Sequence, residues 1–315
     1  MRLETTTSWL AASAALLATA VMAGPASAAP AAATAAAPVT HRTIFANHED
    51  GALYRLELDP TGAVTARTVV DAASGAAASD YDGTRMVFTL PSDPPDRAHD
   101  QVWLREATGA FRFLAAGHLA TFNPDRTGVT IARHVAEGRD PDSKDPAHDE
   151  VTVHRLADGH VFELSPHSDG IRDLQIRNSH DGKSLWMLVA GGSRATSATA
   201  LMRYDRATDT TRKVLSLTTQ GCADFEILPS GANALLACGA QLLTVQLATG
   251  KVTHRTAMPS GVFADSLGGR LNPTTMLLSV FEHAGHAQLA ALDLTTMRTR
   301  ILPGTDGYMN AVAAY

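Results

Sequence analysis

A short apolar segment that ends in a turn recurs along this chain, and no other feature constrains the fold as strongly. It returns at a spacing of roughly 40 to 50 residues, which is the period of propeller blades. Each copy runs into a turn rich in Gly, Asp and Thr, residues that tolerate a positive φ or bond their own backbone. The copies occupy residues 53–56, 102–105, 151–154, 201–204, 242–245 and 289–292.

A second hairpin precedes each copy from the second onward, so that the repeating unit has four strands. An apolar strand follows each hairpin turn, and Asp-Gly pairs at Asp82-Gly83 and Asp181-Gly182 are strong hairpin signals. Four antiparallel strands in succession form one propeller blade. The hairpin turns lie at residues 81–83, 124–126, 180–182, 229–231 and 272–274.

The two ends of the chain complete the count of strands. The first unit, residues 43–70, contains three strands, and one extra strand, residues 308–315, follows the last unit. Pairing that strand into the first unit removes two open sheet edges, which are an aggregation liability. The sequence therefore predicts an all-β, six-bladed β-propeller of four-stranded antiparallel blades, closed by the C-terminal strand pairing into the first blade.

The repeat resembles those of TolB-like and WD-related six-bladed propellers of secreted bacterial proteins. The shared pattern is a small Asp-Gly turn, an apolar strand, a variable loop and a segment of the form L-x-x-x-D-x-x-T-G. Its clearest matches are residues 178–185 with 201–208, and residues 80–85 with 102–109. The resemblance implies a propeller that binds other proteins outside the cytoplasm. The chain departs from the TolB family because Thr43 already starts a blade, which leaves no N-terminal α/β domain, so the family's translocation role is not implied.

The N-terminus has the pattern of a secretory signal peptide. A single early arginine precedes an uncharged apolar stretch from Trp9 to Ala23, which Ala26-Ser27-Ala28 follows as a cleavage site. We expect a signal peptide over 1–28, a disordered Ala/Pro leader over 29–40 and one propeller domain over 41–315. The predicted location is secreted or extracytoplasmic, with an uncleaved anchor as the alternative. No later stretch is apolar enough to span a membrane.

Only two cysteines occur, Cys222 and Cys238, and they flank the turn at 229–231 symmetrically. Facing residues of an antiparallel hairpin are close enough to bridge, and exported proteins favour disulfides. We expect a Cys222–Cys238 disulfide, in a register that also pairs Asp224 with Leu236. Two buried thiols are the alternative.

The net charge of −6 is spread over the chain without a basic run, which argues against a nucleic-acid partner. We expect a monomer that binds an extracytoplasmic protein or a small ligand. The connections between the second and third strands of each unit are long at 91–100, 137–150 and 191–199, so one face of the ring is elaborated. Loops on a rigid scaffold are where binding usually occurs.

A loose Gly-x-x-Asp pattern marks the start of the innermost strands on that long-loop face. It predicts a polar ring at the channel mouth formed by Asp173, Asp224, Asp265 and Asn310, with Arg172 beside Asp173. Such a ring can hold a hard cation, so calcium is a candidate cofactor, although the sequence does not establish a metal. The alternative is that these carboxylates bond backbone amides or pair with Arg172.

The sequence favours a binding module over an enzyme. It contains no G-x-S-x-G elbow and no metal-binding histidine motif, and nothing in it demonstrates catalysis. The alternative is a propeller enzyme of the lactonase, lyase or glycosidase type, with the Asp ring at the channel mouth and His118 and His167 as acid or base.

Overall fold

The computed structural model describes residues 42–72, 75–92, 99–135, 148–164, 172–190, 199–217, 221–282 and 285–314. Within these ranges the chain forms 24 β-strands and no helix, which confirms the prediction of an all-β fold. No helix in the part of the chain described here could therefore cross a membrane.

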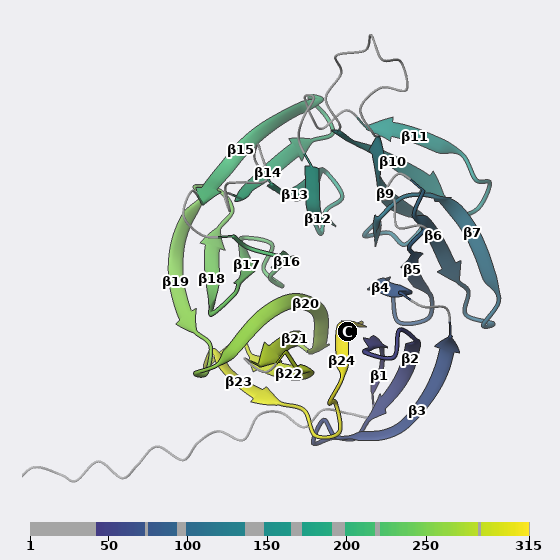
Figure 1. Cartoon of the computed structure of the whole chain (residues 1–315). Helices are drawn as coiled ribbons and strands as arrows, with labels where there is room; N and C mark the ends of the chain where they lie inside the picture. The colour runs from purple at the N-terminus through teal and green to yellow at the C-terminus, as the bar shows by residue number, and fades with distance from the viewer. Residues whose placement is uncertain are drawn as a thin grey trace, which may run out of the picture. The chain divides into compact units, whose positions relative to one another are not determined.

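Four sheets each contain four consecutive antiparallel strands and form four separate blades arranged around a central axis (Figure 1). Their strands are β4 (Ala77–Tyr81), β5 (Met86–Leu90), β6 (Gln101–Arg105), β7 (Phe111–Ala116); β8 (Leu119–Phe122), β9 (Gly128–Val135), β10 (His148–Arg155), β11 (Val161–Leu164); β12 (Arg172–Asn178), β13 (Ser184–Ala190), β14 (Thr199–Asp205), β15 (Thr210–Leu217); and β16 (Asp224–Ile227), β17 (Asn233–Cys238), β18 (Gln241–Gln246), β19 (Lys251–Ala257).

The remaining strands form one sheet of eight, in the order β23-β22-β21-β20-β24-β1-β2-β3. The C-terminal strand pairs antiparallel with β1, so that Ile44 lies opposite Ala313. The strands of this sheet are β1 (Arg42–His48), β2 (Leu53–Leu58), β3 (Val64–Asp71), β20 (Val262–Asn272), β21 (Thr275–Glu282), β22 (Ala287–Asp293), β23 (Arg298–Ile301) and β24 (Tyr308–Ala313).

The sheet of eight corrects the prediction of six separate blades. A single parallel bridge, Gly269 to Ala313, joins β20 to β24, so hydrogen bonding gives four separate blades and one continuous sheet. Glycine makes this approach possible, because a Cβ at Gly268 or Gly269 would collide with the backbone carbonyls of Ala311 or Ala313. The sequence shows these glycines, but it does not show which strand they face.

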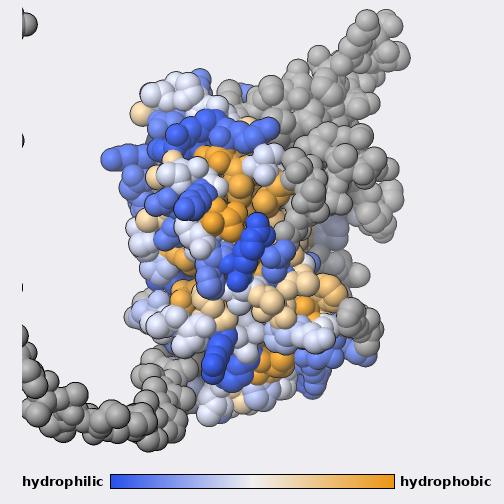
Figure 2. All heavy atoms as spheres, turned by 90° about the vertical axis from the view of Figure 1, so that its left-hand side faces the viewer, coloured by the Kyte–Doolittle hydropathy of each residue, from blue (hydrophilic) through white to orange (hydrophobic). Residues whose placement is uncertain are grey.

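The core lies between neighbouring groups of strands around the ring. One cluster contains Leu104 of β6 and Ile131 of β9, and another contains Leu188 of β13 and Leu236 of β17. The outermost strands are mostly exposed, as in β15 and β19. On the side of the ring that carries these strands, hydrophilic residues cover most of the surface and apolar residues show in patches between them (Figure 2).

The predicted disulfide is confirmed, because Cys222 and Cys238 are joined by an S–S bond. The predicted register of its hairpin is wrong by one residue: Asp224 pairs with Ala237, and Phe225 pairs with Leu236. The shift arises at the turn, where the N–H of Leu228 donates to the carbonyl of Asn233 and closes a loop of four residues. Symmetry about the two cysteines would place the centre of the hairpin at Ser230. The loop of four residues places it between Ser230 and Gly231, which shifts the pairing by one residue.

Antiparallel topology divides the connections between two ends of the ring. The first and third connections of each group of four strands are short turns, and we call their end the turn end. The second and fourth connections lie at the opposite end, the loop end. This distinction locates the site described next.

Candidate functional site

A buried arginine on β12 holds two carboxylates of the next blade at the centre of the ring. Nε of Arg177 donates to Oε2 of Glu226 at 2.9 Å, and its Nη2 lies 3.4 Å from Oδ1 of Asp224. Burial alone would lower the pKa of Arg177, but the two carboxylates outweigh it and raise the pKa. The arginine is therefore a fixed cation that ties β12 to β16.

The two acids around Arg177 are also held by their surroundings. Oδ1 of Asp224 accepts the N–H of Phe225 and its Oδ2 accepts the N–H of Leu267, both at 2.7 Å. Burial raises the pKa of Asp224 and of Glu226, and the charge of Arg177 acts against that effect. Leu267 belongs to β20, so the carboxylate of Asp224 links β16 to β20 of the neighbouring sheet.

A second carboxylate makes an equivalent link on the other side of the ring. Oδ2 of Asp80, on β4, accepts the hydroxyl of Thr121 at 2.9 Å and the N–H of Phe122 at 2.8 Å, both on β8. Its Oδ1 accepts the N–H of Tyr81. Charged side chains of the innermost strands thus join neighbouring blades and give the channel a polar wall.

These side chains line a hollow in the channel with a volume of about 220 Å³. The lining includes Asp80, Arg177 and Glu226 together with Arg126 and His180 from the turns of neighbouring blades. Because those turns are first connections, the hollow opens toward the turn end. Its wall carries charges of both signs.

Two grooves lie beside this hollow at the same end of the ring. One, of about 580 Å³, lies between the blades β12–β15 and β16–β19, and it includes Asp181, Arg203 and Ser230. The other, of about 400 Å³, lies between the blades β8–β11 and β12–β15, and it includes Asp125 and Arg206. His180 lines the hollow and both grooves. The three concavities therefore meet at the turn that contains His180.

The structure places the sequence-predicted ring residues in different environments. Asp224 is buried and engaged as described above, and Asp265 is partly buried on β20, where desolvation raises its pKa. Asn310 lies on β24 with a φ of 46°, a left-handed conformation that asparagine tolerates. The side chains of Arg172 and Asp173 lie outside the described residues, so the predicted ring stays a prediction.

The described residues contain no group of three or more His, Cys, Asp and Glu side chains arranged for a metal ion. The carboxylate of Asp224, a member of the predicted ring, accepts hydrogen bonds from Arg177 and from two backbone N–H groups. The candidate calcium site stays a prediction that rests on the sequence pattern alone.

The candidate acid or base His118 lies in a second polar cluster, near the loop end of the blade β8–β11. Nδ1 of His134 lies 2.8 Å from Oδ1 of Asp149, and Nε2 of His118 lies 3.6 Å from Oδ2 of the same carboxylate. The Asp149 side chain is only 1% exposed. His167, the other histidine predicted for this role, lies outside the described residues.

No protein-family model matches this sequence, and no curated protein matches it. The structure resembles a chain in the crystal structure of a nidogen/laminin complex, with a TM-score of 0.58 and 9% sequence identity over 87% of this chain and 98% of that one. A dipeptidyl peptidase 4 from Porphyromonas gingivalis aligns with a TM-score of 0.42 and 10% identity, over 81% of this chain and 42% of that one. The first of these likenesses, together with the ring of four-stranded sheets, establishes a β-propeller fold.

Proposed function

We propose that this chain is an extracytoplasmic β-propeller that binds a protein or a small polar ligand at the turn end of its ring. The observation that supports this proposal is the meeting of the channel hollow and two grooves at His180. Concave surfaces with convergent polar groups are where ligands usually bind. The acids of the channel accept hydrogen bonds from neighbouring strands, which favours a fixed recognition surface over a reactive group.

This surface lies at the end opposite to the one that the loop lengths indicate. Recognition by the long connections at 91–100, 137–150 and 191–199 remains a prediction from the sequence. The turn end is preferred because short hairpin turns, each closed by backbone hydrogen bonds, line its hollows. Such a surface loses little conformational entropy when a ligand binds.

The proposal includes a six-unit ring and export from the cytoplasm. The sheet of eight has the strand order of two four-stranded units that share one bridge, and six core clusters lie between successive units. The C-terminal strand supplies the innermost strand of the first unit. The Cys222–Cys238 disulfide and the signal-like N-terminus support an oxidising compartment.

Two matched variants test recognition at the turn end. Pro229-Ser230-Gly231 lies at the turn end and Pro259-Ser260-Gly261 at the loop end, and both serines are exposed. Peptides are selected against the purified protein from a displayed random library, and their affinity is then measured for Ser230→Trp and Ser260→Trp. We expect Ser230→Trp, which fills a groove, to weaken binding about tenfold or more, and Ser260→Trp to leave it unchanged. The reverse pattern would refute the proposal.

The cluster of His118, His134 and Asp149 favours an enzyme as the second candidate. A buried carboxylate that orients an imidazole is a common general-base arrangement. Neither the channel hollow nor the two grooves described above are lined by these residues. Hydrolysis of a panel of lactones and glycosides by the native protein, abolished by His134→Gln, would support this candidate.

A further inference from the structure

A row of four side chains crosses the blade β12–β15 on one side, and three of the four are arginines. Each member is directly paired with the next in the strand register, and from the innermost strand outward they are Arg177, Trp186, Arg203 and Arg212. Directly paired residues of antiparallel strands lie on the same side of the sheet. This side faces the blade β16–β19, because Trp186 belongs to the core cluster between β13 and β17 and Arg177 contacts Glu226 of β16.

The protein supplies fewer counterions to this row toward the outside of the ring. Arg177 lies against two carboxylates, as described above. Arg203 has one carboxylate partner: its Nη2 lies 3.3 Å from Oδ2 of Asp205, and both side chains are partly exposed. The outermost member, Arg212, is exposed, and its guanidinium forms no hydrogen bond or ion pair with the residues that the structure describes.

Arg203 and Arg212 thus place two like charges directly opposite each other on the outer strands of the blade. Such a pair destabilises an antiparallel sheet. The guanidinium of Arg203 is fixed in this position, because its Nε donates to Oγ of Ser184 at 2.8 Å and its Cζ lies 5.9 Å from the centre of the Trp186 ring. An anion that contacts both guanidinium groups would offset their repulsion.

Both arginines line the groove of about 580 Å³ between the blades β12–β15 and β16–β19. The wall that β16–β19 contributes consists of neutral residues, drawn from 227–232 and 246–248. Among the described residues of the lining, Asp181 is the one acid. It belongs to the turn at the end of the groove, where its Oδ2 lies 3.9 Å from Nζ of Lys183. The neighbouring blade therefore offers the two arginines no counterion.

The charges around this groove leave an excess of one positive charge. The groups counted are the cations Arg203, Arg212 and Lys183 and the acids Asp181 and Asp205, and protonation of His180 would only add to the excess. Arg203 and Lys183 each have one of these acids within 4 Å, which leaves Arg212 uncompensated. One carboxylate would balance the groove, and the planar fork of an arginine matches its two oxygens.

We infer that Arg203 and Arg212 together bind one carboxylate on an acidic segment of a protein partner. The inference rests on the proposed binding function and specifies the chemistry of the partner at this groove. Charge complementarity selects the acidic segment, and the exposed small residues Ser230 and Ala232 on the facing wall leave room for the chain that carries it. A free sulfate or phosphate ion carries more negative charge than the groove balances.

The test uses peptides selected against the purified full chain from the displayed random library. We expect these peptides to be enriched in Asp and Glu relative to the unselected library. Replacing one acidic residue of a selected peptide by its amide should weaken binding to the native protein about tenfold or more, and Arg212→Gln should weaken binding of the acidic peptide to a similar extent. Arg212→Gln should bind the acidic and amide peptides with nearly equal affinity, since a double-mutant cycle isolates the contact between the two charges.

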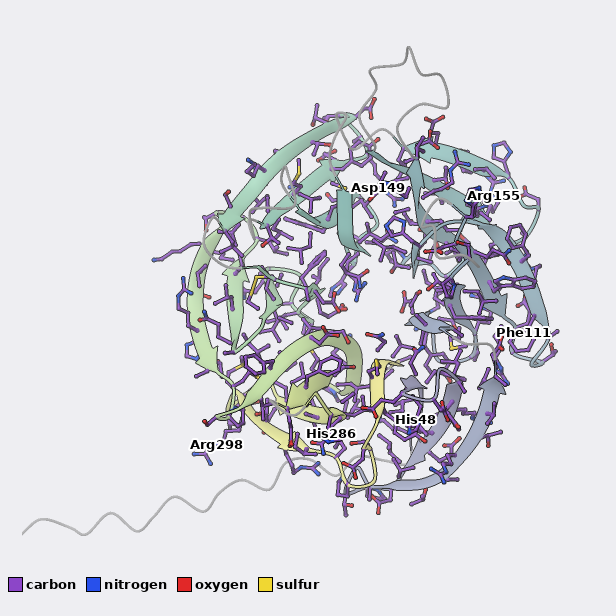
Figure 3. All side chains as sticks on the ribbon, in the orientation of Figure 1. His48, Phe111, Asp149, Arg155, His286 and Arg298 are labelled. Carbon is purple, nitrogen blue, oxygen red and sulfur yellow. A yellow bond between two sulfur atoms is a disulfide. The ribbon has the colours of Figure 1, made fainter. Side chains whose placement is uncertain are left out.

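Lys213→Gln and Arg298→Gln are the matched controls, because each removes one exposed positive charge outside the groove. Lys213 adjoins Arg212 on β15, but it is paired with Met202 and lies on the other side of the sheet. Arg298 lies on β23 on the outer side of the ring (Figure 3). Both variants should bind the acidic peptide as the native protein does. Arg212→Gln should also raise the midpoint of thermal unfolding of the free protein, because it removes one of two opposed like charges.

Native affinity in Arg212→Gln, or equal binding of the acidic and amide peptides to the native protein, would overturn the inference. An equal loss of affinity in Lys213→Gln or Arg298→Gln would overturn it as well, because net charge alone would then explain the effect. Displacement of the peptide by sodium sulfate, but not by sodium chloride at the same ionic strength, would overturn the assignment to a protein segment.

The same peptides separate this inference from the proposed function. If they lose affinity for Ser230→Trp but bind Arg212→Gln as they bind the native protein, recognition at the turn end stands and only this inference fails. If they bind Ser230→Trp normally and Ser260→Trp weakly, the proposed function itself fails.

Discussion

Replacing Arg177 by methionine should destabilise the propeller strongly at neutral pH. The guanidinium lies 2.9 Å from Glu226 and 3.4 Å from Asp224, and the three side chains are 11%, 21% and 4% exposed, respectively. Removing one member of a buried ion pair typically costs about 3–5 kcal/mol because a buried charge is left without compensation. Asp224 keeps its two backbone donors, so the loss falls mainly on Glu226. We therefore expect a decrease of about 3 kcal/mol in the free energy of unfolding.

Urea denaturation at two pH values measures this effect. Burial already raises the pKa of Asp224 and Glu226, and removing Arg177 removes the charge that opposes this rise. A carboxyl whose pKa is raised by folding stabilises the native state below its unfolded pKa, and that stability is lost as pH increases through the folded value. The deficit of Arg177→Met should thus shrink between pH 7 and about pH 4.

A double variant, Arg177→Met with Glu226→Leu, is the control. It removes the uncompensated carboxylate together with the cation, and it should recover most of the lost stability. A single variant that loses less than about 1 kcal/mol at pH 7, or a deficit that does not depend on pH, would refute the role assigned to Arg177.

Three further predictions concern stability. Burial acts to raise the pKa of Asp82, but hydrogen bonds from Arg85 and Thr84 outweigh it and hold the pKa below its usual value. Asp82→Asn should therefore cost about 2 kcal/mol at pH 7 and little at pH 2, where native Asp82 has lost this contribution, as measured by urea denaturation. Reduction of the Cys222–Cys238 disulfide should cost about 3 kcal/mol in the same assay, and an unchanged midpoint would contradict a structural role. Gly268→Ala should cost on the order of 1–3 kcal/mol, because its Cβ would collide with the carbonyl of Ala311; native stability in this variant would show that β24 lies farther away.

The sequence predicts most of the local structure because strands and turns depend on neighbouring residues. Asp-Gly at Asp82-Gly83 and Asp181-Gly182 forms the expected turns, with positive φ at both glycines. The C-terminal strand pairs with β1 as the strand count indicates. The disulfide was also predictable, since both cysteines belong to one hairpin.

The candidate site could not be predicted in the same way. Arg177, Glu226 and Leu267 belong to three groups of strands. Whether they come into contact depends on how those groups are arranged around the ring axis, which the sequence does not show. The sequence held one usable signal. Arg206 follows the third strand of its group at the position that Leu247 and Leu294 occupy in theirs, where each backbone N–H donates to a carbonyl in the first turn of the group. The continuous sheet of eight was missed because the pairing of Gly269 with Ala313 joins two strands that are distant in sequence.

Hydrogen–deuterium exchange with a library-selected peptide tests the central claim, recognition at the turn end, most directly. The claim predicts that bound peptide slows exchange at the turns 123–128, 179–184 and 228–233. Exchange at the loop-end turn 258–261 should stay as it is in the free protein. Protection confined to the loop end, at 258–261 or along 91–100, would contradict the claim. It would favour the long connections as the recognition surface instead.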